Sequence, residues 1–101
     1  MRVLMMVRLP HAEFNASVKD GSAGSKLNRI LESIQPEAVY FTEQEGQRGA
    51  LIVVDLPDPS SLPALSEPWF LTFRADVHFQ IAMTPSDLKK AGLEALGPVW
   101  A

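Results

Sequence analysis

Short apolar runs along the chain alternate with segments in which apolar residues recur every three or four positions. Val3 to Val7 is a continuous apolar run shortly before Pro10, which is typical of a central strand buried on both faces. Three further strands are expected at Ala38 to Glu43, Ala50 to Leu56 and Ala75 to Met83. The first two of these flank a short polar segment with two glycines, Gln44 to Gly49, which predicts a hairpin.

The apolar stripe of a helix is clearest in the segment after Ser25. Four apolar residues there follow the spacing i, i+3, i+4 and i+7: Leu27, Ile30, Leu31 and Ile34. We expect Ser25 to cap this helix and Pro36 to end it, because the residue before a proline is disfavoured in helical geometry. Another helical segment, Ala12 to Lys19, precedes it across the helix-breaking sequence Asp20 to Ser25.

Two more helices are expected in the second half of the chain. A short, irregular helix is expected around Leu62 to Ser66, and Pro68 just after it is expected to interrupt the helix. The terminal helix has stronger signals, namely an N-cap, a proline at the first position, an acid at the third and a glycine stop. These four signals are Thr84, Pro85, Asp87 and Gly92.

This order of elements predicts one α+β domain over residues 1–101, a ferredoxin-like βαββαβ unit with a C-terminal helix. Right-handed connections place the helices on one face of a four-stranded antiparallel sheet. The residues expected on the other face are Leu4, Met6, Tyr40, Thr42, Asp76, His78 and Gln80. Such a face is too apolar for water and too polar for a sealed core, so we predict that it packs against a symmetric copy in a homodimer.

Composition narrows the classes of function. The formal net charge is −3, with acids and bases interspersed, so we expect no nucleic-acid binding. No apolar run approaches the roughly 20 residues of a membrane helix, and Met1 to Leu9 has the pattern of a strand rather than of a leader, so we expect no membrane partner. The chain has no cysteine, which suits a reducing compartment and predicts a cytoplasmic protein.

His78 and Glu43 are the candidates for moving a proton. The strand places His78 beside Asp76 and Gln80, and imidazole titrates near neutrality. The plainer interpretation of a lone histidine is a hydrogen-bonded structural or interface residue. Glu43 is either a carboxylate with a raised pKa or, more simply, a solvated hairpin residue. His11 is expected to be exposed, and two histidines far apart in sequence give no metal signature, so no metal is predicted.

Two further features invite a functional interpretation. Glu67 to Phe70 is the densest aromatic cluster and would suit the wall of an apolar ligand site, although core packing is the plainer interpretation. Gly21 to Lys26 superficially resembles a phosphate-binding loop, but it follows a helical segment and its glycine spacing is too short. We interpret it as a helix break. The sequence has no cofactor motif, and no cofactor is expected.

The order of elements resembles that of the dimeric α+β barrel superfamily, whose protomers are ferredoxin-like. This superfamily includes muconolactone isomerase-like, YCII-like and antibiotic-biosynthesis-monooxygenase-like proteins. The resemblance spans nearly the whole chain and is most telling at Glu67 to Phe70, at Ala75 to Met83 and at Met83 to Leu88, which are similar to segments of small bacterial members. Members act as isomerases, cofactor-independent oxygenases, haem enzymes or ligand binders, so the resemblance implies a fold and a dimer rather than a reaction.

Three functions remain open on the sequence alone. The first is a homodimer that binds a small, partly apolar molecule beside the sheet. The residues expected to line that site are Tyr40, Trp69, Asp76 and His78. The second is a cofactor-independent isomerase or monooxygenase for an aromatic or lactone substrate, with His78 or Glu43 moving the proton. The third is an interaction module that holds a partner through its dimer surface and the tail Gly97 to Trp100, where Trp100 is also expected to pack on its own dimer.

Overall fold

The structure is a computed structural model that describes residues 1–101. It contains five α-helices and one four-stranded antiparallel sheet, which confirms the predicted α+β class. Along the chain the elements are β1 (Arg2–Leu9), α1 (His11–Lys19), α2 (Ala23–Ile34), β2 (Ala38–Gln44), β3 (Gln47–Asp55), the 3₁₀ turn η1 (Pro59–Ser61), α3 (Leu62–Phe73), β4 (Asp76–Ile81), α4 (Pro85–Lys90) and α5 (Leu93–Trp100).

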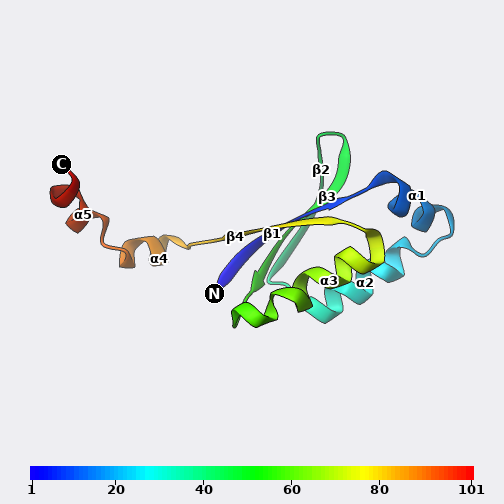
Figure 1. The fold of residues 1–101 in the computed structure, drawn as a ribbon, viewed down its shortest axis with the longest axis horizontal. Coiled ribbons are helices and arrows are strands. Elements are labelled where there is room, and N and C mark those ends of the chain that lie inside the picture. Colours follow the sequence, from blue (N-terminus) through cyan, green and yellow to red (C-terminus); the bar gives the residue numbers. More distant parts are fainter.

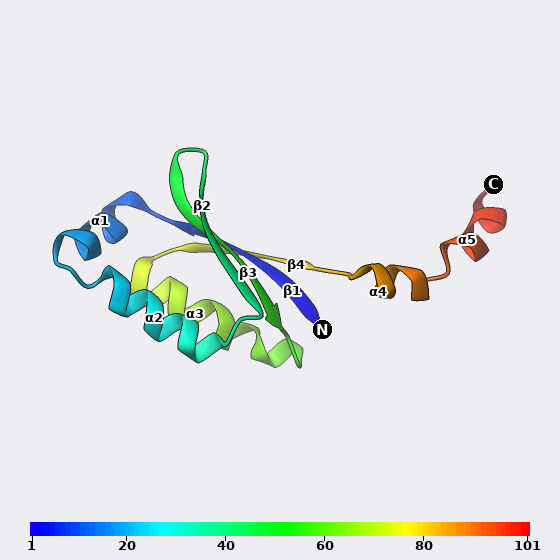
Figure 2. The same ribbon diagram turned by 180° about the vertical axis from the view of Figure 1, so that it is seen from behind.

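The strands lie in the order β2-β3-β1-β4, and every neighbouring pair is antiparallel. β1 is therefore a central strand, as predicted. Its side chains alternate between buried and half-buried positions. The prediction that β1 is buried on both faces is therefore wrong within the protomer, because α1, α2 and α3 all lie on one side of the sheet (Figures 1 and 2).

The hydrophobic core fills the space between these three helices and the sheet. Phe14 from α1, Ile30 and Ile34 from α2, and Leu65, Trp69 and Phe73 from α3 belong to the same buried cluster as alternate residues of β1 and β3. The ring centroids of Phe14 and Phe73 are 5.2 Å apart, and those of Trp69 and Phe73 are 6.5 Å apart. These aromatic contacts hold α1 and α3 against the same side of the sheet.

The structure corrects two predicted helix boundaries. α2 begins at Ala23 with Ser22, rather than Ser25, at the N-cap position. α3 does not stop at Ser66 but continues through Pro68 to Phe73. A proline removes one hydrogen bond from a helix, but Trp69 and Phe73 beyond it are fully buried. Their burial outweighs the lost hydrogen bond, because each large side chain contributes roughly 1.5–3 kcal/mol when removed from water.

The predicted hairpin is present, with a shorter loop than expected. β2 and β3 continue toward each other until only Glu45 and Gly46 join them. Both residues have positive φ angles, 51° and 78°, which is the backbone of the tight turns that suit the twist of paired strands. Gly46 adopts this conformation without the steric cost that Glu45 bears.

Residues 82–101, called the arm below, extend away from residues 1–81, called the body below (Figure 1). The molecule measures 60 × 28 × 19 Å, and its radius of gyration is 17.0 Å, compared with about 13 Å for a compact domain of this length. The predicted terminal helix is present as α4. Its capping box is formed by the hydroxyl of Thr84, which accepts from the Asp87 N–H, and the Asp87 carboxylate, which accepts from the Thr84 N–H.

α5 was not expected from the sequence, because it contains Gly97 and Pro98, the two poorest helix-forming residue types. No residue of α4 or α5 is buried. The arm therefore consists of formed helices without contacts that exclude water from their side chains.

Gly49 gives a test of how closely the central strands pack. A Cβ atom at this position would lie 2.9 Å from the main-chain oxygen of Val7, whereas a Cβ at Gly24 in α2 would meet open space. We expect Gly49→Ala to lower the free energy of unfolding by about 1–3 kcal/mol, because a strand must shift. The matched control Gly24→Ala should raise it by about 0.5–1 kcal/mol. Urea denaturation measures both, and an unchanged Gly49→Ala variant would contradict the packing.

Candidate functional site

The sheet face opposite the helices, called the outer face below, carries one row of side chains across all four strands. The strand registers align Tyr40 of β2 with Leu51 of β3, Leu51 with Met6 of β1, and Met6 with His78 of β4. In the neighbouring row, the aligned residues are Ala38, Val53, Leu4 and Gln80. This register confirms which residues were predicted to share the face.

The outer face has an apolar middle and polar edges. Leu4, Met6, Leu51 and Val53 occupy the two central strands and are half-buried. Asp76, His78 and Gln80 are exposed along the β4 edge, and Tyr40 on β2 is 67% exposed. An apolar ring can lie on the middle of this surface, while hydrogen-bonding groups at either edge remain free to orient a polar substituent.

Three of the four side chains predicted to line a ligand site therefore lie on the outer face: Tyr40, Asp76 and His78. Tyr40 and His78 stand at opposite ends of their row, three strand spacings or about 14 Å apart. Asp76 lies two residues before His78 on the same strand and aligns with Arg8. The guanidinium of Arg8 donates to the Glu45 carboxylate at 2.8 Å.

Trp69 does not lie on the outer face. It is fully buried on the helix side of the sheet, and its indole N–H has no hydrogen-bond partner. The interpretation of Glu67 to Phe70 as part of the core is confirmed for Trp69. The sequence favours Trp69 as a ligand contact only because Glu67 to Phe70 is the densest aromatic cluster. Aromatic composition does not show which side of a helix an indole occupies once α3 continues past Pro68.

Glu43 and His78, the two candidates for moving a proton, project from opposite faces of the sheet. Glu43 shares one face of β2 with Val39 and Phe41, and it aligns with Arg48 of β3, on the helix side. His78 lies on the outer face beside Met6. The two side chains do not converge on a common substrate position, so a reaction on the outer face would depend on His78 without Glu43.

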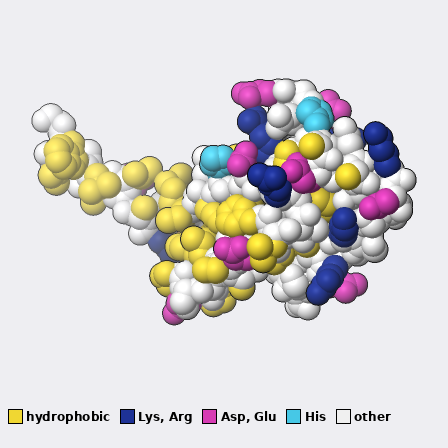
Figure 3. All heavy atoms as spheres, turned by 45° about the vertical axis from the view of Figure 1, so that its right-hand side comes forward, with side chains coloured by type: hydrophobic (Ala, Val, Ile, Leu, Met, Phe, Trp, Pro, Cys, Tyr) yellow, Lys and Arg dark blue, Asp and Glu magenta, His cyan; other side chains and the backbone are white.

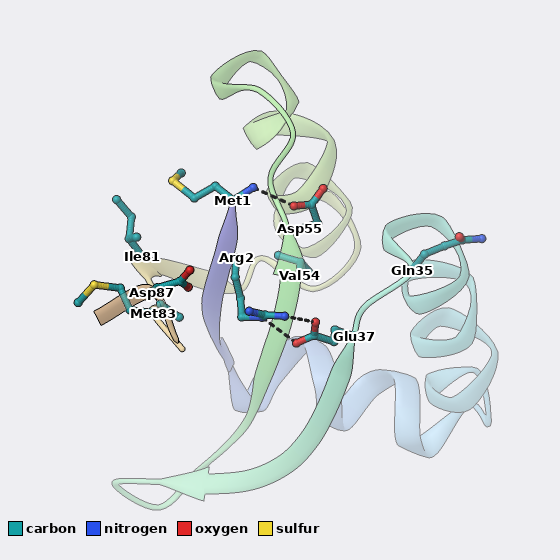
Figure 4. Close-up of a pocket in the computed structure, with 10 residues that line it drawn as sticks. Met1, Arg2, Gln35, Glu37, Val54, Asp55, Ile81, Met83 and Asp87 are labelled. Atoms are coloured by element: carbon teal, nitrogen blue, oxygen red, sulfur yellow. Dashed lines mark hydrogen bonds and ion pairs between the residues drawn. The ribbon is translucent and has the colours of Figure 1, made fainter. Parts of the chain in front are cut away.

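A cavity of about 570 Å³ lies where β1 begins and β3 and β4 end (Figure 4). On one side, Arg2 donates from Nε and Nη2 to the two carboxylate oxygens of Glu37, at 3.0 and 2.7 Å. The amino nitrogen of Met1 donates to Asp55 at 2.9 Å. On the other side, Ile81 and Met83 are 71% and 64% exposed at the root of the arm. The charged groups on the first side of the cavity are paired with each other. The apolar side chains on the second side are exposed to solvent.

The Arg2–Glu37 pair was not found by sequence reasoning. The two residues are 35 positions apart, and no local pattern links them. The two hydrogen bonds from Arg2 lower the pKa of Glu37 below its usual value, because they favour the charged carboxylate. This pair connects the start of β1 to the residue before β2.

The predicted helix break is present but shorter than expected, because it covers only Asp20 to Ser22, whereas Ala23 to Lys26 form the first turn of α2. Gly21 takes a φ angle of 81° between α1 and α2. The ammonium group of Lys26 donates to the Ser17 hydroxyl at 2.9 Å, so it connects the two helices across the break.

No established family model matches this sequence, and a comparison with curated proteins finds no similar sequence. The resemblance to dimeric α+β barrel proteins therefore stays a prediction. None of the helices combines the length and apolar character needed to cross a bilayer. The case for a function depends on the geometry of the outer face.

The placement of Trp69 predicts that its loss affects stability. Trp69→Ala should lower the free energy of unfolding by about 3–5 kcal/mol, because it leaves a cavity in the core. Leu71→Ala, on the same helix at a position that is 81% exposed, is the control and should change it by less than about 0.5 kcal/mol. Chemical denaturation measures both. If the Trp69→Ala variant had normal stability, the placement of Trp69 in the core would be wrong, and Trp69 would again be a candidate for ligand contact.

The Arg2–Glu37 pair predicts a pH dependence. Because the pKa of Glu37 is lowered in the folded protein, the stabilisation is fully present above the unfolded value of about 4.3 and is lost as the pH falls through the folded pKa. In Arg2→Gln, carboxyl titration by NMR should show the pKa of Glu37 returning toward its usual value. Asp58 is the control, because its low pKa comes from hydrogen bonds with Ser60 and should not change.

Proposed function

We propose that the protein is a homodimer of ferredoxin-like protomers that binds a small, partly apolar molecule between its two outer faces. This proposal is based on one row of side chains across the outer face, formed by Tyr40, Leu51, Met6 and His78. The strand order β2-β3-β1-β4 supports the ferredoxin-like assignment, since two interleaved βαβ units with right-handed connections produce this arrangement.

In this proposal a second protomer packs against the outer face. A sheet with an apolar surface needs another layer against it, and the helices of the body lie on the opposite face (Figure 2). Leu4, Met6, Leu51 and Val53 supply an apolar middle that a two-fold axis would place against its own copy. Two sheets packed in this way lie about 10 Å apart, a separation that interdigitating side chains normally fill. A bound ring would therefore replace part of the contact between the two copies over Met6 and Leu51.

The chemistry of the face indicates the kind of molecule. An aromatic or alicyclic ring would contact Met6 and Leu51, and a hydroxyl or carboxyl group on the ring would reach His78 at one edge or Tyr40 at the other. The imidazole and the phenol can each donate a hydrogen bond. Asp76 near His78 favours a substituent that can also donate. Small hydroxylated aromatic molecules meet these conditions, including hydroxyaromatic acids whose hydroxyl group lies beside His78 and whose carboxylate points away from Asp76.

The dimer predicts a specific response to charge on the outer face. Met6→Lys should give a monomer, since the ammonium group would be desolvated at the centre of the interface. Leu71→Lys also replaces an apolar residue, but on the helix side, where Leu71 is 81% exposed, and should leave the oligomeric state unchanged. Light scattering after size exclusion measures the masses. A monomeric wild type, or a dimeric Met6→Lys, contradicts face-to-face association.

The ligand site predicts selective binding. A thermal-shift screen of aromatic and hydroxylated acids should find a compound that raises the melting temperature of the wild type. Titration calorimetry with that compound should give a dissociation constant about tenfold higher for His78→Ala, as expected for the loss of one hydrogen bond. His11→Ala removes the other histidine, at the start of α1, and should bind normally. A screen without any hit, or equal affinities for the two variants, would count against the site.

A further inference from the structure

The arm carries apolar side chains that nothing in the protomer covers. Six large apolar residues lie along it: Met83, Leu88, Leu93, Leu96, Val99 and Trp100. Their exposed fractions range from 43% at Leu88 to 82% at Trp100. Figure 3 shows hydrophobic side chains along the arm and on the adjoining surface of the body. This density of exposed apolar groups is that of an interaction surface rather than of a solvated tail.

The helices of the arm are too short to be stable by themselves. α4 has 6 residues and α5 has 8, whereas isolated helices shorter than about 12–15 residues are marginal in water. The capping box at Thr84 helps to start α4, but α5 contains Gly97 and Pro98 and has no side-chain cap. Packing against another surface is therefore the interaction that stabilises this segment.

The charges of the arm indicate what kind of surface that is. Residues 82–101 contain two bases, Lys89 and Lys90, and two acids, Asp87 and Glu94, so their formal charges cancel. A segment that docks on anionic lipid or nucleic acid would carry a clear excess of bases. A neutral, apolar arm fits an apolar protein surface.

A second copy of this chain lies within reach and has exposed apolar side chains of its own, such as Met1 and Ile81 beside the root of its arm. The arm continues directly from β4, which is an edge strand of the sheet that carries the outer face. A copy that covers the outer face therefore lies beside the point where the arm begins. Six side chains that each remove roughly 100 Å² from water, together with an equal surface that they cover, give an area for two arms of about 2,400 Å², which is the size of a stable interface.

We propose that the arm of each protomer packs on the body of its partner, so that the dimer is held by exchanged arms as well as by its sheets. A two-fold axis satisfies both arms at once, and exchange of identical segments is a common route to dimers. This inference rests on the homodimer proposed above. It adds residues 82–101 to the interface and places Trp100 on the partner subunit.

Trp100 provides the test. The chain has two tryptophans, and Trp69→Phe leaves Trp100 as the only one, with a residue of similar character in the core. We expect the emission of this variant to shift to shorter wavelength, and its quenching by acrylamide to fall at least threefold, over the same protein concentrations at which light scattering shows the dimer. Protection that is equally strong in the monomer would mean that the arm folds on its own body. An exposed Trp100 within the dimer would overturn the proposal as well.

A second variant series covers the case in which Trp69→Phe does not fold. Leu96→Asp should raise the dissociation constant of the dimer at least tenfold, and Leu96→Asp combined with Trp100→Asp should raise it at least a hundredfold. Glu94→Gln lies on the same helix and should change it by less than twofold. Unchanged dissociation constants in the first two variants would refute arm exchange. The proposed function would still stand if the variants without a bound arm remained dimers that bind the ligand, whereas a monomeric wild type would refute both proposals.

Discussion

The sheet has two faces, and α1, α2 and α3 of the protomer cover only one of them (Figure 2). On the covered face, alternate residues of β1 and β3 join the helices in a continuous buried cluster. On the other face, the intervening residues of the same strands are half-buried and apolar in the middle. Because a strand directs successive side chains to opposite faces, every residue that strengthens the core also fixes a neighbour on the open surface.

The strand register turns this open surface into a defined pattern. It places polar groups of β2 and β4 at the edges and Leu4, Met6, Leu51 and Val53 between them, with the charged residues Arg2 and Arg8 at the two ends of β1. A shift by one residue in any strand would exchange its two faces, so the same core contacts that fix the register also fix the pattern of side chains on the outer face. The close approach of Gly49 to the main chain of Val7 contributes to this constraint.

The arm and the outer face both need to be covered, because both expose apolar side chains to water. Each exposes apolar groups that the protomer leaves in contact with water, and they are linked through β4. A domain of about 100 residues buries only roughly two thirds of the surface of its unfolded chain. Placing the remaining apolar surface in an interface gives stability that the small core does not supply, and a cavity between two protomers is a common location for a ligand site.

The sequence by itself determined the elements with a strong local signal: the stripe from Leu27 to Ile34, the cap at Thr84, and the alternation that places His78 and Tyr40 on one face. Only the tertiary structure decided that α3 continues through Pro68, that Trp69 is in the core, and that Arg2 pairs with Glu37. The tertiary structure also placed Glu43 and His78 on opposite faces of the sheet, and it directed the arm away from the body. Periodicity and capping depend on residues a few positions apart, whereas these outcomes depend on packing between segments far apart in the chain.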